Sequence, residues 1–239
     1  MRVAILSDIH GNRTAFEAVL KDLRDIAPDL VLHGGDLADS GSGPAEIVDQ
    51  IRDLGWQGVL GNTDEIFTRP DSLGEFAGQS TAPASIWAAI REMADFTREL
   101  LGEERISWMR CLPRMQIHDS LALVHASPDN LWRSPAPESS DAELERAFVA
   151  LEKELVVFGH IHRPFIRRLQ HRIFANSGSV GMPHDGDPRS AYLLIDEGQP
   201  EIRRVEYDVE KEIQALVDSG LPHADWVIRT IRAGSPQRP

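Results

Sequence analysis

Short apolar runs alternate with stretches of helical spacing along the first sixty residues. A run of three or four apolar residues bounded by polar ones predicts a buried strand, and apolar residues three or four apart predict one face of a helix. Asn12 can cap the first helix, Pro28 ends it, and Gly55 stops the second. Strands alternating with helices favour a layered α/β fold. The expected elements are strands at 3–6, 30–32 and 58–60 and helices at 12–27 and 44–54.

Residues 65–113 break this alternation and predict a helical insert. The segment 70–83 is rich in Gly, Pro, Ser and acidic residues, so we expect a loop there. Helical spacing returns at 84–101 and again at 106–112. The insert directly follows a polar segment at a strand end. We therefore expect either a lid over a site or a helical pair packed on the surface.

The remaining chain is predicted to be rich in strands, followed by helices near the C-terminus. We interpret residues 1–239 as a single domain, with C-terminal helices at about 208–233 that pack on the sheet or on a second subunit. Asp208 can cap the first of these helices, and Gly220 ends it. The expected strands are 115–117, 121–125, 156–159, 165–169, 172–175, 191–195 and 202–207, with a helix at 141–151.

Composition narrows the classes of partner. The formal net charge of −13 disfavours nucleic-acid polymers and anionic membranes, although a small phosphorylated substrate stays compatible with it. Cys111 is the only cysteine, so neither an intrachain disulfide nor a cysteine metal cluster is expected. The chain runs from Met1 straight into its first motif and has no apolar stretch near ~20 residues, so we expect no signal peptide, no membrane span and a cytoplasmic location.

Polar side chains that can bind metals follow the predicted strands. Each group alone is ordinary, since Asp-x-His is commonly a capped turn and a lone histidine often ends a strand. Together they predict a site for two divalent cations. Mixed carboxylate, amide and imidazole ligands suit Mn²⁺, which we expect first, or Fe, Zn²⁺ or Ni²⁺ better than Ca²⁺. The candidate ligands are Asp8, His10, Asp36, Asn62, His125, His160 and His162.

These motifs resemble those of the calcineurin-like metallophosphoesterases, in particular the small bacterial and archaeal branch with Asp-x-His, Gly-Asp, Gly-Asn-x-Asp, His and Gly-His-x-His. The similarity spans residues 3 to about 195. It implies a four-layer α/β/β/α sandwich of two mixed sheets flanked by helices. It also implies that Asp36 bridges two metals. One metal would take Asp8, His10 and His162, and the other Asn62, His125 and His160.

The resemblance further implies hydrolysis of phosphate esters by a hydroxide that bridges the metals, with Asp36, Asn62 and His125 at the reaction centre. Many relatives have Gly-Asn-His-Asp, whose histidine protonates the leaving group, whereas this chain has Thr63 there. Threonine is a poor proton donor at neutral pH, so a phosphodiester with a good leaving group is the expected substrate. Asp64 is expected to brace the turn.

Alternative functions stay open at this point. A phosphomonoesterase, a protein phosphatase or a dinucleoside-polyphosphate phosphatase would share the metal ligands. A metal-bearing scaffold protein is the non-enzymatic alternative, although every ligand position is filled, which argues against it. An assembly of identical subunits is also open.

Several residues outside the ligand set are candidates for substrate contacts. Asn12 and Arg13 lie at a helix start, where phosphates bind well, and Thr63 adjoins Asn62. The turn at 176–181 either faces an anion with its N–H groups or supports the histidine loop. Arg189 is interpreted as a surface residue, as is the arginine cluster at 163–172. The other histidines are expected to be structural or exposed: His33, His118, His171, His184 and His223.

Overall fold

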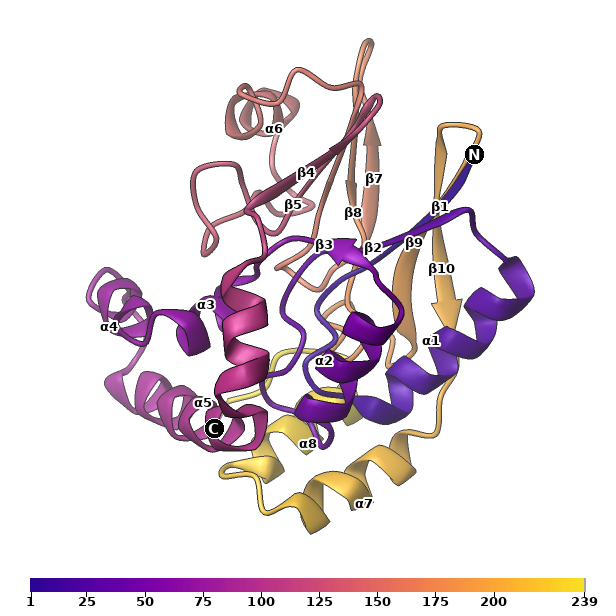
Figure 1. The fold of residues 1–239 in the computed structure, drawn as a ribbon. Coiled ribbons are helices and arrows are strands. Elements are labelled where there is room, and N and C mark those ends of the chain that lie inside the picture. Colours follow the sequence, from indigo (N-terminus) through magenta and orange to yellow (C-terminus); the bar gives the residue numbers. More distant parts are fainter. Residues whose placement is uncertain (239) are drawn as a thin grey trace.

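The computed structural model describes residues 1–238, and two five-stranded mixed sheets form its centre (Figure 1). In the first sheet the order is β10-β9-β1-β2-β3, with β1, β2 and β3 parallel and β9 and β10 antiparallel to their neighbours. Its strands are β1 (Arg2–Leu6), β2 (Leu30–His33), β3 (Gln57–Gly58), β9 (Ser190–Asp196) and β10 (Gln199–Val205).

The second sheet has the order β4-β5-β6-β8-β7. Strands β5, β6 and β8 are parallel, and β4 and β7 run antiparallel at its two edges. The strands are β4 (Met115–His118), β5 (Leu121–Val124), β6 (Leu155–Phe158), β7 (Phe165–Arg168) and β8 (Ile173–Asn176).

Helices cover the outer faces of both sheets, which confirms the predicted sandwich (Figure 1). The first sheet is covered by α1 (Arg13–Ile26) and α2 (Pro44–Asp53), and the second by α6 (Asp141–Ala147). The segment after β3 forms α3 (Asn62–Thr68), α4 (Asp71–Ala77) and α5 (Ala84–Arg110), and the chain closes with α7 (Val209–Ser219) and α8 (Ala224–Ala233).

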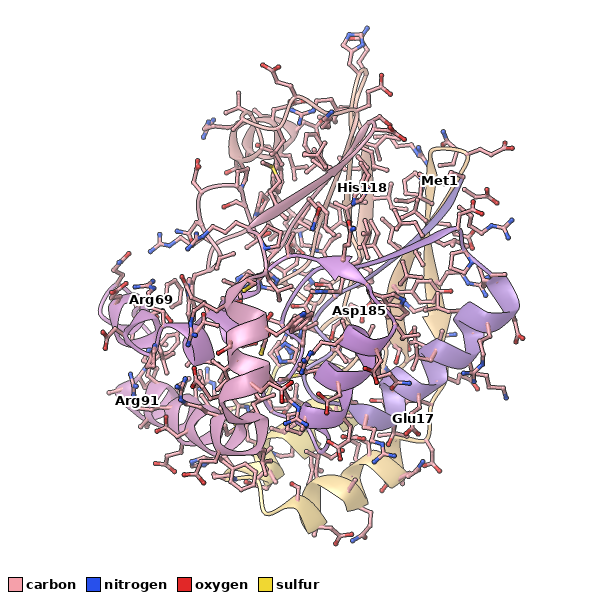
Figure 2. The ribbon with its side chains drawn as sticks, in the orientation of Figure 1. Met1, Glu17, Arg69, Arg91, His118 and Asp185 are labelled. Carbon is pink, nitrogen blue, oxygen red and sulfur yellow. The ribbon has the colours of Figure 1, made fainter. Side chains whose placement is uncertain are left out.

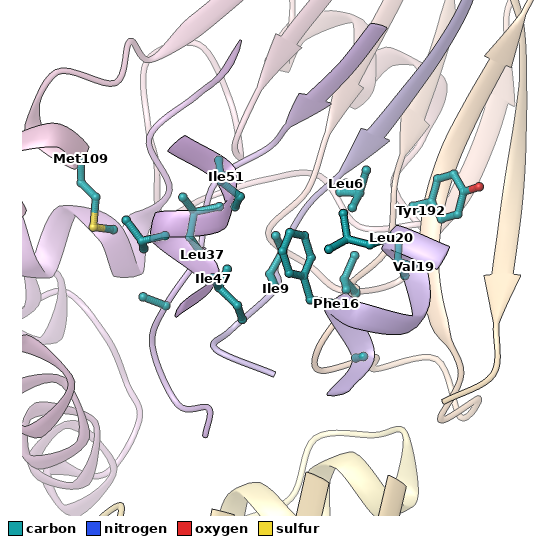
Figure 3. Packing of buried hydrophobic residues seen from close by; sticks show 14 of the residues in the cluster. Leu6, Ile9, Phe16, Val19, Leu20, Leu37, Ile47, Ile51, Met109 and Tyr192 are labelled. Atoms are coloured by element: carbon teal, nitrogen blue, oxygen red, sulfur yellow. The ribbon is translucent and has the colours of Figure 1, made fainter. Parts of the chain in front are cut away.

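The period of two along β1 explains the layers. Val3 and Ile5 are buried between the two sheets, whereas Ala4 and Leu6 are buried beneath the helices of the first sheet. Strands β5 and β6 divide their side chains in the same way between the central core and the core under α6. Figure 3 shows Phe16 and Leu20 of α1 packed near Leu6, and Ile47 of α2 near Leu37. Because every face of these strands is apolar, polar groups are confined to their ends.

The insert packs on the C-terminal helices. Met93 of α5 shares one buried cluster with Leu216 of α7 and with Val227 and Ile231 of α8. The C-terminal helices therefore pack within this chain. None of the described helices is both long and apolar enough to cross a membrane.

Some predicted boundaries were wrong. The loop expected at 70–83 contains α4, because Leu73 is fully buried in the core and tertiary packing outweighs the weak local propensity. Gly102, at φ 66° and ψ 166°, breaks the helical geometry of α5, so the second helical stretch begins before 106. Strand β3 lies at 57–58 instead of 58–60, and α6 ends at 147 instead of 151.

Candidate metal centre

The carboxyl ends of both sheets deliver the predicted ligands to one place. Asp8 and His10 follow β1, Asp36 follows β2, and Asn62 begins α3. From the second sheet, His125 follows β5, and His160 and His162 follow β6. All seven are buried except His160, which is partly exposed. The structure therefore brings together every predicted ligand, as expected at strand ends in α/β sheets.

Four of the ligands form one group. The nearest side-chain N and O atoms of Asp8, His10, Asp36 and His162 all lie within 4.8 Å of one another. His162 Nε2 is 3.2 Å from Asp8 Oδ1 and 3.1 Å from His10 Nε2. His10 Nε2 is 3.7 Å from Asp36 Oδ2. This is a compact set of two carboxylates and two imidazoles.

A second group lies on the other side of Asp36. Asn62 Oδ1 is 2.8 Å from His125 Nε2 and 2.8 Å from His160 Nδ1. His125 Nε2 is in turn 3.5 Å from the same Asp36 Oδ2. The Asp36 carboxylate thus adjoins both groups, and its other oxygen accepts a hydrogen bond from the backbone N–H of Thr63 at 2.9 Å.

The outer nitrogens of three histidines face backbone carbonyl oxygens. His10 Nδ1 lies 3.1 Å from the backbone oxygen of Asp39. His125 Nδ1 lies 2.8 Å from that of Gly34, and His162 Nδ1 lies 2.6 Å from that of Met182. A carbonyl can only accept, so each Nδ1 carries the proton and each Nε2 keeps a lone pair facing the carboxylates. This arrangement orients imidazoles that bind metals, and the residues therefore fit divalent cations.

The backbone of the site is strained at the ligands themselves. Positive φ angles occur at Asp8 (55°), His10 (50°), Asp36 (54°), His160 (69°) and His162 (55°). Residues with side chains rarely adopt this region, and each such conformation costs about 1 kcal/mol or more. The surrounding fold holds these ligands in place against their local preference.

Close packing requires a glycine beside the shared carboxylate. A Cβ atom on Gly61 would lie 2.1 Å from Asp36 Oδ1. On the other sheet, a Cβ on Gly159 would lie 2.5 Å from Asp8 Oδ2. The glycines of Gly-Asn-x-Asp and Gly-His-x-His therefore allow the two sheets to approach at the ligands.

Burial and charge set the protonation of the ligands. Burial lowers the pKa of His10 to about 4 and that of His160 to about 4, which favours neutral rings. Burial acts to raise the pKa of Asp8, but without a cation a protonated His162, whose Nε2 lies 3.2 Å from Asp8 Oδ1, outweighs it, so this pKa is lowered. Burial also opposes protonation of His162, but Asp8 reverses this and raises the His162 pKa. A cation requires ionised carboxylates and imidazole lone pairs, so a cation bound here would take the place of the proton shared by Asp8 and His162.

Two polar groups brace the ligand loops. The Asp64 carboxylate accepts hydrogen bonds from the backbone N–H groups of Asp36 at 2.8 Å, Leu37 at 3.0 Å and Gly61 at 3.0 Å. This confirms the bracing role predicted for Asp64. In the turn at 176–181, Ser179 Oγ donates to the backbone oxygen of Asp8 at 2.7 Å, so that turn supports the first ligand loop.

The three residues predicted to contact the substrate lie in different environments. Asn12 is engaged locally, donating from Nδ2 to Gly181 O at 2.9 Å and capping α1. Arg13 is exposed and pairs with Glu17 at 2.8 Å. Thr63 lies beside the candidate ligand Asn62, with its buried Oγ1 lacking a partner among residues 1–238. The roles of all three toward a substrate stay predictions.

The arginines interpreted as surface residues have acidic or amide partners. Arg163 pairs with Glu138, Arg167 with Asp141, and Arg172 with Glu145, while Arg168 donates to Gln199. Arg189 pairs with Asp187 at 2.6 Å. Arg168 and Arg189 are exposed, in agreement with the interpretation as surface charges. Arg172 differs, because its side chain is only 17% exposed and donates to the backbone oxygens of Lys153 and Phe148.

Sequence reasoning missed a cavity next to the ligands. The cavity measures about 340 Å³ and is lined by Asn62, Thr63 and His160 together with several aromatic rings. His184 also lines it, and its ring stacks on that of His162 at 4.3 Å. The aromatic residues are widely separated along the chain, so no local pattern reveals that they share one wall. His184 sits in no motif that predicts its stacking.

Comparison with known proteins identifies relatives along most of the chain. An uncharacterized protein of Methanocaldococcus jannaschii is 29% identical over 249 residues, covering 94% of this chain and 95% of that protein. The crystal structure of a metallophosphoesterase from Sphaerobacter thermophilus is 27% identical, has a TM-score of 0.81, and covers 98% of this chain and 100% of its own.

A symmetrical bis(5'-nucleosyl)-tetraphosphatase of Sodalis glossinidius is 29% identical over 151 residues, which is 61% of this chain and 50% of that enzyme. The profile of the calcineurin-like phosphoesterase superfamily domain matches residues 1–198, which include all seven candidate ligands. With this match and the ligand geometry, the chain belongs to the calcineurin-like phosphoesterase superfamily.

Proposed function

We propose that this protein hydrolyses phosphodiesters at a centre of two divalent cations, with Mn²⁺ expected first. The observation that supports this most directly is the position of Asp36, whose carboxylate adjoins both ligand groups (Figure 1 shows β2, the strand that Asp36 follows). One cation would be held by Asp8, His10 and His162 with Asp36. The other would be held by Asn62, His125 and His160 with Asp36.

Two cations of this kind supply a water of pKa near ~7 and neutralise the charge that develops on a phosphoryl group. The protein's own residues prepare the place where this happens. Asp36 is held by the Thr63 N–H, and Asn62 offers an uncharged oxygen. A neutral ligand limits the negative charge that an incoming phosphate must meet. His125 is fixed by Gly34 O at 2.8 Å, so its Nε2 cannot turn away.

The proton supply decides between substrates. Position 63, where many relatives have a histidine, is a threonine. A leaving group of low pKa departs without a proton, whereas an alkoxide needs one. We therefore expect activated diesters to react faster than alkyl monoesters. A phosphomonoesterase requires a proton donor that Thr63 does not supply.

The relative that cleaves bis(5'-nucleosyl)-tetraphosphates raises the polyphosphate alternative, and this chain matches only half of that enzyme. A scaffold without catalysis is the remaining alternative. All ligand positions carry residues able to bind a metal, which favours the enzyme.

The test is hydrolysis of bis(4-nitrophenyl) phosphate and of 4-nitrophenyl phosphate by protein stripped of metal, with Mn²⁺, Ni²⁺, Zn²⁺ or Mg²⁺ added back. Diester turnover that depends on added metal supports the proposal. A clear preference for the monoester would refute the inference from Thr63. If two metals bind and neither ester is hydrolysed, the scaffold hypothesis would replace the proposal of an enzyme.

A further inference from the structure

The cavity beside the metal ligands joins parts of the chain that are distant in sequence. Asn62 and His160, two of the ligands, form part of its lining. Phe76 of α4 and Trp87 of α5 contribute from the insert, and Trp226 contributes from α8. A phosphate at the ligands would therefore direct one of its ester groups toward this cavity.

Four aromatic side chains, Phe76, Trp87, Trp132 and Trp226, form part of the cavity wall. The ring of Phe76 stacks on that of Trp132 at 4.7 Å and 24°, and it meets the ring of Trp87 edge-on at 5.6 Å and 82°. Two of the indoles are held by hydrogen bonds, since Trp132 Nε1 donates to Glu65 Oε2 at 2.8 Å and Trp226 Nε1 donates to Gln237 O at 2.8 Å. A wall of fixed rings binds flat aromatic groups with little loss of side-chain entropy.

Positive charge is lacking in the same cavity. Among its described lining residues there is no lysine or arginine, and Asp39 is a buried acid. Arg69 and Arg91 of the insert lie at the outside of the molecule in Figure 2, and Arg69 is paired with Glu75 at 2.7 Å. A chain of four phosphates would bring several negative charges that neither the cavity nor a net charge of −13 compensates.

We propose that this cavity binds one flat, uncharged aromatic group of a phosphodiester and excludes polyphosphate chains. The volume of about 340 Å³ lies at the lower end of the range for small-molecule pockets, which suits one nucleoside or aryl group and not two. Trp87 and Thr63 both line the cavity, and Trp87 Nε1 and Thr63 Oγ1 are buried without partners in the described chain. The placement of the phosphate rests on the proposed function.

Binding, not turnover, is the first measurement. Titration calorimetry with the Mn²⁺-loaded protein compares adenosine 5′-monophosphate, phenyl phosphate and ribose 5-phosphate, which share a monophosphate and differ in the aromatic group. We expect at least one aromatic ligand to bind about tenfold more tightly than ribose 5-phosphate, since stacking on aromatic side chains contributes ~1–3 kcal/mol per base. Tight binding of adenosine 5′-monophosphate alone assigns a nucleoside, and tight binding of both aromatic ligands assigns any aryl group.

The matched variants are Phe76→Leu in the wall and Phe96→Leu on α5. Phe96 is also partly buried but lies outside the cavity. Phe76→Leu is expected to remove most of the tenfold preference, whereas Phe96→Leu should keep it. Equal binding of all three ligands by the wild-type protein would overturn the inference without any variant. Hydrolysis of diadenosine tetraphosphate faster than of a dinucleoside monophosphate would overturn the exclusion of polyphosphates.

The two proposals fail separately. If the diester is not hydrolysed but aromatic ligands still bind more tightly, the proposed activity is refuted and the proposal for the cavity stands. Turnover of the nitrophenyl diester with no aromatic preference in binding would do the reverse.

Discussion

His33 provides a sharp test of how burial controls protonation near the sheet that carries the metal ligands. Its side chain is fully buried at the end of β2, and neither ring nitrogen has a hydrogen-bond partner in the described chain. Burial lowers the pKa of His33 from 6.5 to about 4. The folded protein therefore holds the ring neutral at a pH where the unfolded chain would protonate it.

The direction in which stability changes with pH follows from proton linkage. Between pH 6.5 and 4 the unfolded state binds more protons at His33 than the folded state does, so acid favours unfolding. The full stability is present above pH 6.5 and is lost as the pH falls toward 4. With ~1.36 kcal/mol per pH unit, the loss is about 2 kcal/mol by pH 5 and about 3 kcal/mol by pH 4.

The perturbation is His33→Leu, which replaces the ring by an apolar side chain that cannot titrate. Urea unfolding of metal-free wild type and variant is followed at several values of pH, and the difference at pH 8 removes any effect of packing alone. We expect the wild type to lose about 2 kcal/mol more than the variant between pH 8 and pH 5. Parallel pH profiles of the two proteins would refute the reasoning.

Further predictions concern the metal centre. Asp36→Asn should abolish metal-dependent diester turnover and weaken binding of at least one metal, measured by the nitrophenyl assay and by calorimetry. Gly61→Ala would place a Cβ 2.1 Å from Asp36 Oδ1 and should weaken metal binding, whereas in Gly74→Ala the new Cβ has its nearest contact at 3.7 Å and metal binding should stay unchanged. Asp64→Asn replaces one carboxylate oxygen by an NH2 group, so at least one of the three backbone N–H groups loses its acceptor. The free energy of unfolding should fall by about 2 kcal/mol in urea titrations, and an unchanged midpoint would contradict the bracing role. Chelation should lower the melting temperature in scanning calorimetry, because bound cations stabilise only the folded ligand set.

The sequence predicts most of the fold because its strands are short and wholly apolar. The strands at 3–6 and 121–124 could be predicted from their short runs of apolar residues alone, and both are buried strands. Helix α4 was missed because its seven residues have weak helical propensity and depend on the burial of Leu73. Element ends shifted by one or more residues because capping and tertiary packing, not periodicity, set them.

For the candidate metal centre, the sequence alone determined the types of the candidate ligands and their order along the chain. Each ligand follows a strand, and strands that share a sheet must end near one another. Only the tertiary structure decided that the two sheets present Asp36 between two ligand groups, that backbone carbonyls orient His10, His125 and His162, and that five ligands take left-handed conformations. The aromatic cavity was decided in the same way, since Phe76 of α4, Trp132 of the loop after β5 and Trp226 of α8 line one cavity. They come from distant segments and leave no periodic signal in the chain.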